Sequence, residues 1–129
     1  MIQGIRFHTE MGYLTVEVDG QWDLRDAEHV IESIRDEARK RGQTRIFLDL
    51  HNFLPPESIM TRYFTGEYIA EHWGYPFRIA ALWSREYYDG LAVSVAVNRG
   101  AIFQVFFAKE KALEWLLKES NKMDSGNGN

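Results

Sequence analysis

The chain has 129 residues, which is short enough for one domain, and it carries a net charge of −4 and no cysteine. The lack of cysteine excludes disulfides, thiolate catalysis and Cys-ligated zinc, and the interspersed acids and bases form no basic patch for nucleic acid. No apolar run is long enough for a transmembrane segment and the N-terminus has no signal-peptide core, so we expect a cytoplasmic protein.

The first part of the chain predicts two strands, a helix and a third strand. Residues 4–9 and 13–20 are expected to form a hairpin, and the second of them alternates apolar and polar residues cleanly. Residues 23–41 carry an apolar stripe at helical spacing, with Asp23 as the N-cap. Residues 44–50 are almost continuously apolar, which is typical of a strand covered on both faces.

The rest of the chain predicts a helix, a strand, a second strand and a last helix, at residues 57–73, 77–83, 101–107 and 109–119. Residues 90–97, "GLAVSVAV", alternate like a strand, but they lie where a crossover between parallel strands requires a helix. We therefore predict a helix there on topology. Residues 120–129 are polar and Gly-rich, which predicts a disordered tail.

The order of these elements predicts an α/β domain over residues 1–119. We expect a five-stranded mixed sheet with about four helices, mostly parallel, with the first strand antiparallel at an edge.

The order, and several short segments within it, resemble the STAS-like superfamily and its SpoIIAA-like group over about residues 2 to 119. The segments that carry the resemblance are "RIFLDL" before a loop and helix, "RIAAL", "NRG", "VFF" and the set Ala112, Trp115 and Leu116. The resemblance implies a binding or regulatory domain without a cofactor. Family members include anti-sigma-factor antagonists, transporter tails and stand-alone proteins compared with lipid carriers.

The sequence departs from the antagonist branch at the start of the second helix. Antagonists carry Asp-Ser-Ser-Gly there, with a serine that the partner kinase phosphorylates. This chain has "PPESIM", in which Ser58 is the only hydroxyl and the glycine is missing. A phosphate on Ser58 would gain from the helix N-terminus but would lie beside the carboxylate of Glu57. We predict a helix-start serine, and a phosphorylation switch near Ser58 stays as the alternative.

Asp49, His51 and Ser58 lie on and after a central strand, where ligands gather in open α/β sheets. The chain has no G-x-S-x-G motif, and these residues are better explained as a strand-end aspartate, a surface histidine and a helix-start serine. We predict no catalytic residue, and therefore no enzyme.

Glu67, Glu71 and His72 are the best metal-ligand candidates in the sequence. Glu67 and Glu71 share a helix face, but His72 is rotated about 100° from Glu71. The spacing therefore favours a solvated acidic helix face over a metal site, and we predict neither a metal nor a cofactor.

The second helix has more apolar residues than one buried stripe needs, in a chain that is 14% aromatic. Gly66, in its middle, suggests a close approach of another backbone. The surplus could be a wide helix packed between neighbours, or a surface for an apolar, lipid-like ligand, a protein partner, a second copy or a membrane. The residues predicted to bind are Met60, Phe64, Tyr68, Tyr87 and Tyr88.

Overall fold

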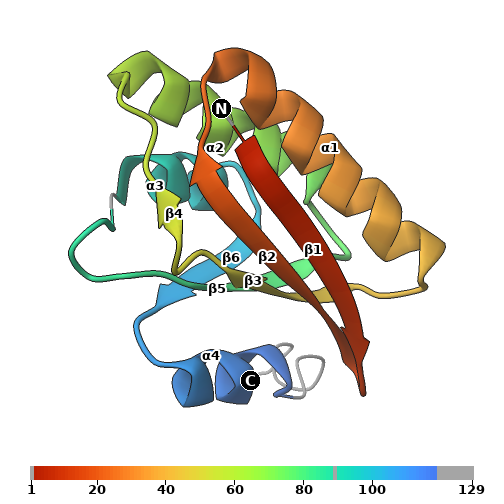
Figure 1. Cartoon of the computed structure of the whole chain (residues 1–129). Helices are drawn as coiled ribbons and strands as arrows, with labels where there is room; N and C mark the ends of the chain where they lie inside the picture. The colour runs from red at the N-terminus through yellow and green to blue at the C-terminus, as the bar shows by residue number, and fades with distance from the viewer. Residues whose placement is uncertain (1, 89, 119–129) are drawn as a thin grey trace.

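Strands and helices alternate in the computed structural model, which describes residues 2–88 and 90–118 (Figure 1). The elements are β1 Ile2–Glu10, β2 Tyr13–Gln21, α1 Leu24–Lys40, β3 Arg45–Asp49, β4 Phe53–Leu54, α2 Ile59–His72, β5 Arg78–Leu82, α3 Gly90–Asn98, β6 Ile102–Phe106 and α4 Lys109–Leu116. The predicted tail at 120–129 lies outside the described residues. Within the described ranges, no helix combines the length and the apolar composition needed to cross a bilayer.

The strands form one sheet in the order β1-β2-β3-β5-β6. β1 pairs with β2 antiparallel and the remaining neighbours along this path pair in parallel. The predicted mixed sheet, with an antiparallel first strand at its edge, is therefore confirmed. A sixth strand, β4, was not predicted: it has two residues and pairs with the end of β2. A strand this short has no periodicity to read in a sequence.

Helices cover both faces of the sheet (Figure 1). α1, α2 and α3 lie on one face and α4 lies on the other. The central strands are buried on both sides: Ile46 and Leu48 of β3 belong to the main core, whereas Phe47 between them packs with Ala112 and Leu116 of α4. This explains the nearly continuous apolar sequence of β3.

α1 begins and ends as the sequence predicts. The side chain of Asp23 accepts a hydrogen bond from the amide of Asp26 at 2.9 Å, which is the N-cap interaction. Gly42, just past the end of the helix, has a φ of 68°, the left-handed conformation that glycine adopts without strain. The buried stripe of α1 consists of Ala27, Val30, Ile31, Ile34 and Ala38.

Residues 90–98 form a helix, which confirms the helix predicted there from topology, although the sequence alternates like a strand. α3 is the crossover between the parallel strands β5 and β6. It packs against α2 at Gly66, where an added Cβ would lie 2.5 Å from the carbonyl oxygen of Ala92. The predicted close backbone approach at Gly66 is confirmed.

Candidate functional site

An apolar cavity of about 50 Å³ lies between the sheet and the pair of helices α2 and α3. Several of its lining residues stand at or just beyond the carboxyl ends of parallel strands, where ligands bind in open α/β sheets. The lining residues are Trp22, Leu48, Leu50, Phe53, Pro56, Thr65, Ile69, Trp73, Trp83, Ala92, Val93, Phe103 and Val105.

Three tryptophans line this cavity, and their indole N–H groups differ in their bonding. Trp73 Nε1 donates to the carbonyl of Ile31 at 2.9 Å, and Trp83 Nε1 donates to the carbonyl of Phe53 at 3.0 Å. Trp22 Nε1 is sealed from solvent and has no acceptor among the residues that the structure describes. Buried donors are almost always paired, so this nitrogen, which is buried within the cavity wall and not exposed at its surface, is chemically unusual.

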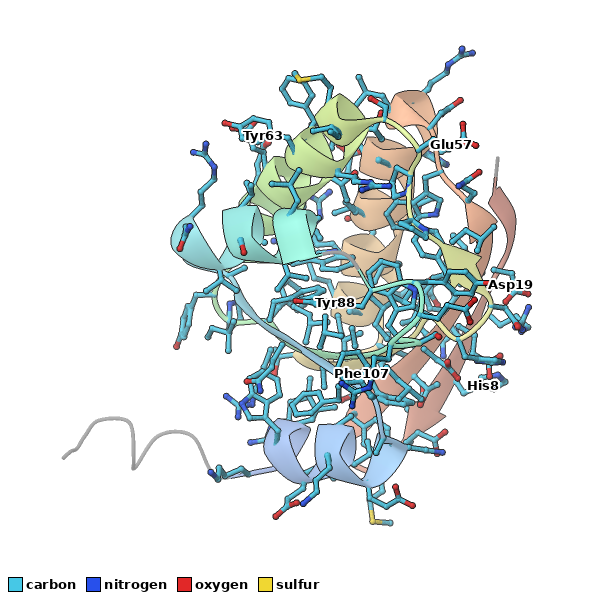
Figure 2. All side chains as sticks on the ribbon, turned by 90° about the vertical axis from the view of Figure 1, so that its left-hand side faces the viewer. His8, Asp19, Glu57, Tyr63, Tyr88 and Phe107 are labelled. Atoms are coloured by element: carbon cyan, nitrogen blue, oxygen red, sulfur yellow. The ribbon has the colours of Figure 1, made fainter. Side chains whose placement is uncertain are left out.

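A row of aromatic rings leads from the cavity to the surface. Trp22 contacts Phe53 at a centroid distance of 4.8 Å, and Phe53 contacts Trp83 at 5.9 Å. Trp83 then contacts Tyr88 at 6.1 Å, and Tyr88 contacts Phe107 at 5.7 Å. Figure 2 shows Tyr88 and Phe107 together on the side turned to the viewer. Both rings are about two-fifths exposed, so the row ends in an aromatic surface.

The binding residues predicted on α2 differ in how exposed they are. Met60 is exposed, Phe64 is half-buried with its ring against Tyr63, and Tyr68 packs against the main core. Among the described residues that line the cavity, none belongs to the predicted set of five. Tyr88 contacts the cavity wall at Trp83.

The cavity is lined by a different row of α2. Thr61 and Thr65 are buried polar residues, and Thr65, Ile69 and Trp73 line the cavity. These four positions also recur every four residues, as do Met60, Phe64 and Tyr68. The sequence does not indicate that this row is buried, because threonine, with its hydroxyl group, is typical of surface positions. In the fold, the Thr65 hydroxyl donates to the carbonyl of Thr61 at 2.7 Å, which allows its burial.

Ser58 is the N-cap of α2. Its Oγ accepts from the amide of Thr61 at 3.2 Å, and the side chain is exposed. It lines a second, more polar hollow of about 210 Å³ together with Trp22, Asp23 and Glu57. The N-termini of α1 and α2 therefore meet at this hollow, but two acidic side chains already lie there.

The trio of Asp49, His51 and Ser58 is not brought together as one bonded group. His51 Nδ1 and Asp49 Oδ1 are 2.6 Å apart, and the His51 amide also donates to that carboxylate at 3.1 Å. The Oγ of Ser58 is engaged at the start of α2 instead. The geometry matches a strand-end aspartate that orders the following loop.

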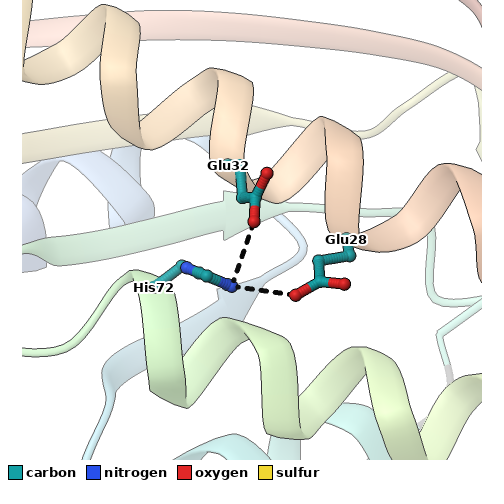
Figure 3. A group of neighbouring side chains, drawn as sticks. All are labelled: Glu28, Glu32 and His72. Carbon is teal, nitrogen blue, oxygen red and sulfur yellow. Dashed lines mark hydrogen bonds and ion pairs between the residues drawn. The ribbon is translucent and has the colours of Figure 1, made fainter.

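A cluster of possible metal ligands joins α1 to α2 (Figure 3). Carboxylates of Glu28 and Glu32 lie 3.4 and 3.7 Å from Nε2 of His72. Of the two acids that the sequence offered with His72, Glu71 lies 4.0 Å from Nε2 of His72, whereas Glu67 forms an ion pair with Arg99 at 2.9 Å. Glu28 and Glu32 are remote from His72 in the chain, so only the packing of the two helices reveals the cluster.

Arg35 determines what this cluster can do. Its guanidinium lies 2.7 Å from Nδ1 of His72. Arginine can only donate, so Nδ1 is the acceptor and Nε2 carries the hydrogen that faces Glu28. A metal at Nε2 would have to displace this hydrogen and the Arg35 contact. The cluster therefore connects α1 to α2 through polar contacts of His72.

No family model matches the sequence, and no curated protein matches it either. Solved structures do match. One is an uncharacterised DUF3478-family protein with a SpoIIAA-like fold from Shewanella loihica PV-4, with 18% identity, a TM-score of 0.57, and coverage of 88% of this chain and 92% of the other. Another is an anti-sigma factor antagonist from Mycobacterium paratuberculosis, with 12% identity, a TM-score of 0.62, and coverage of 92% and 96%. The chain has a SpoIIAA-like fold, and at these identities the likeness establishes the fold alone.

Proposed function

We propose that the protein is a non-enzymatic binding module that takes an apolar group into the cavity beneath α2 and α3. The observation that carries this proposal is an apolar cavity at the carboxyl ends of parallel strands, joined to the surface by a row of aromatic rings.

The size of the cavity limits the ligand. A cavity of about 50 Å³ is larger than a water molecule needs but smaller than the roughly 150 Å³ of an engineered cavity that binds benzene. It suits a small apolar group or the end of a chain. A lipid-like ligand would require α2 and α3 to move away from the sheet, and their tight contact at Gly66 favours movement as a pair.

Tryptophan fluorescence offers a direct test. Three of the four tryptophans line the cavity, and the fourth, Trp115, packs on the α4 side of the sheet. In a Trp115→Phe variant, a brominated alkane such as 1-bromobutane should quench the remaining fluorescence in a saturable way, because bromine quenches at short range. Val93→Phe, which fills the cavity, is the matched control and should remove saturation. Linear, unsaturable quenching in both variants would contradict the proposal.

The alternative is a regulator that docks on a protein partner and is switched at Ser58. It is supported by the exposed hydroxyl at the start of α2 and by the shared fold with an anti-sigma factor antagonist. The missing glycine and the neighbouring Glu57 weigh against it. We expect Ser58→Asp to leave partner binding in the native host unchanged. Loss of one specific partner with Ser58→Asp, but not with Ser58→Ala, would favour this regulator.

A further inference from the structure

We infer that the ligand of the cavity is an apolar molecule with an uncharged acceptor oxygen, such as a ketone, an ester or an ether, and that Trp22 Nε1 donates to this oxygen. The inference rests on the proposed function and names the chemical class of its ligand.

The bonding of the three indoles supports this class. Trp73 and Trp83 donate to backbone carbonyls, whereas Trp22, only 6% exposed, donates to no described residue. A buried donor without a partner is rare in a folded protein, and it is unfavourable. A ligand that brings an acceptor would remove this penalty, so binding is coupled to one particular polar atom.

Water is a poor substitute for such a ligand. A buried water molecule needs two to four polar partners. Apart from the indoles, Thr65 is the one polar side chain among the described residues of the wall, and its hydroxyl hydrogen already goes to the carbonyl of Thr61. The cavity wall is therefore better suited to an apolar ligand that carries a single acceptor than to a water molecule.

The acceptor should be neutral. No lysine, arginine or histidine lines the cavity among the described residues, and Asp23 and Glu57 lie in the adjacent hollow that shares Trp22. A carboxylate buried here would have no counter-charge, and burial of an unpaired charge is costly. Because the nitrogen is sealed from solvent, the oxygen reaches it only as the ligand parts the wall.

An isosteric pair of ligands tests the inference: 2-butanone and 2-methyl-1-butene, which differ only in a carbonyl oxygen against a methylene. Each indole N–H gives its own peak in a proton–nitrogen NMR spectrum. We expect 2-butanone, but not the alkene, to move the Trp22 peak downfield, while the Trp73 and Trp83 peaks move little. Butanoate, the charged probe, should give no saturable shift.

Affinity ratios give an independent readout. The dissociation constant of 2-butanone is divided by that of 2-methyl-1-butene. In this ratio the cavity's general preference for apolar groups cancels. This ratio should change by about 3- to 10-fold between the wild type and Trp22→Phe, the worth of one hydrogen bond. Trp115→Phe, on the α4 side of the sheet, keeps the Trp22 N–H and should leave this ratio unchanged.

The outcomes separate the two proposals. Saturable binding of both ligands with no Trp22 shift and no change of ratio would overturn the acceptor inference and leave the apolar cavity standing. A downfield Trp22 peak in the free protein would also overturn it, because an acceptor would already be present. If neither 2-butanone nor 2-methyl-1-butene binds, both the acceptor inference and the proposed apolar binding function are overturned.

Discussion

Gly66 of α2 lies directly against the backbone of Ala92 in α3. A Cβ at Gly66 would be 2.5 Å from the carbonyl oxygen of Ala92 and 2.7 Å from the Cβ of Val95. Real Cβ atoms essentially never approach so closely, so the two helices can be this near only because residue 66 has no side chain. The contact sets the distance between α2 and α3, two helices that both line the cavity.

Gly66→Ala should therefore destabilise the protein, although alanine is the better helix former. The substitution gains about 1 kcal/mol in helix propensity, but overpacking of a tight contact typically costs about 1–3 kcal/mol. Urea unfolding should show a net loss of stability. Ser94→Ala, at an exposed position of α3, is the control and should stay within about 0.5 kcal/mol of the wild type. A stabilised Gly66→Ala protein would contradict the close contact.

Phe64→Ala should have an intermediate effect. Phe64 is half-buried against Tyr63, so its truncation should cost about 1–2 kcal/mol at roughly 25 cal/mol per Å² of apolar surface. Met60→Ala, at a residue that is 57% exposed, should cost less than about 0.5 kcal/mol. Neither change should affect quenching by 1-bromobutane, because neither residue lines the cavity.

Urea unfolding, gel filtration and the quenching assay together distinguish a core position from a subunit contact for Met60 and Phe64. A cost of about 3–5 kcal/mol for Phe64→Ala would put the ring in the core. A loss of dimerisation with either variant would instead identify Met60 and Phe64 as a subunit contact.

Acid stability should depend on Asp23. The hydrogen bond from the Asp26 amide is the main cause that lowers the pKa of Asp23 below its ordinary value. A lowered pKa in the folded state stabilises the protein above the unfolded pKa of about 3.9. This contribution is lost as the pH falls through the lower folded value.

The matched variant is Asp23→Asn, since asparagine is an equally good N-cap but cannot titrate. Urea unfolding at a series of pH values from about 5 downward should show the wild type losing more stability than the variant below about pH 4. Parallel profiles for the two proteins would exclude this role for Asp23.

Much of the fold could be predicted from sequence because its signals are local. The cap at Asp23, the apolar stripe of α1 and the two-sided burial of β3 are all visible as residue patterns. Topology was needed for α3, whose alternating small residues suggest a strand. A short helix that packs its small residues against both α2 and the sheet has no strong amphipathic pattern to detect.

The candidate site could not be predicted in the same way. Its wall combines residues from β3, β4, β6, α2, α3 and the connecting segments, including Trp22 just after β2 and Trp83 just after β5, and no spacing in the sequence connects them. On α2 two rows have the same four-residue spacing, and hydrophobicity alone favours the apolar row over the row that contains Thr61 and Thr65, which lines the cavity. The unpaired donor of Trp22 depends on which carbonyls surround it, which only the folded chain determines.

The last prediction concerns the cluster of Glu28, Glu32, Arg35 and His72, which joins α1 to α2. In the wild type, Arg35 holds Nδ1 of His72 as an acceptor and keeps the hydrogen on Nε2, beside Glu28 and Glu32. Zinc needs the lone pair of Nε2, so it should leave the thermal midpoint of the wild type unchanged. In Arg35→Leu the ring is free to take the other tautomer, and one histidine with two carboxylates becomes a three-ligand zinc site. Zinc should then raise the midpoint in a concentration-dependent way, because a ligand that binds the folded state stabilises it by mass action. The double variant Arg35→Leu, His72→Gln is the control and should lose this response. Equal stabilisation of the wild type and Arg35→Leu by zinc would show that Arg35 does not set the tautomer, and the cluster would then have to be treated as a metal site.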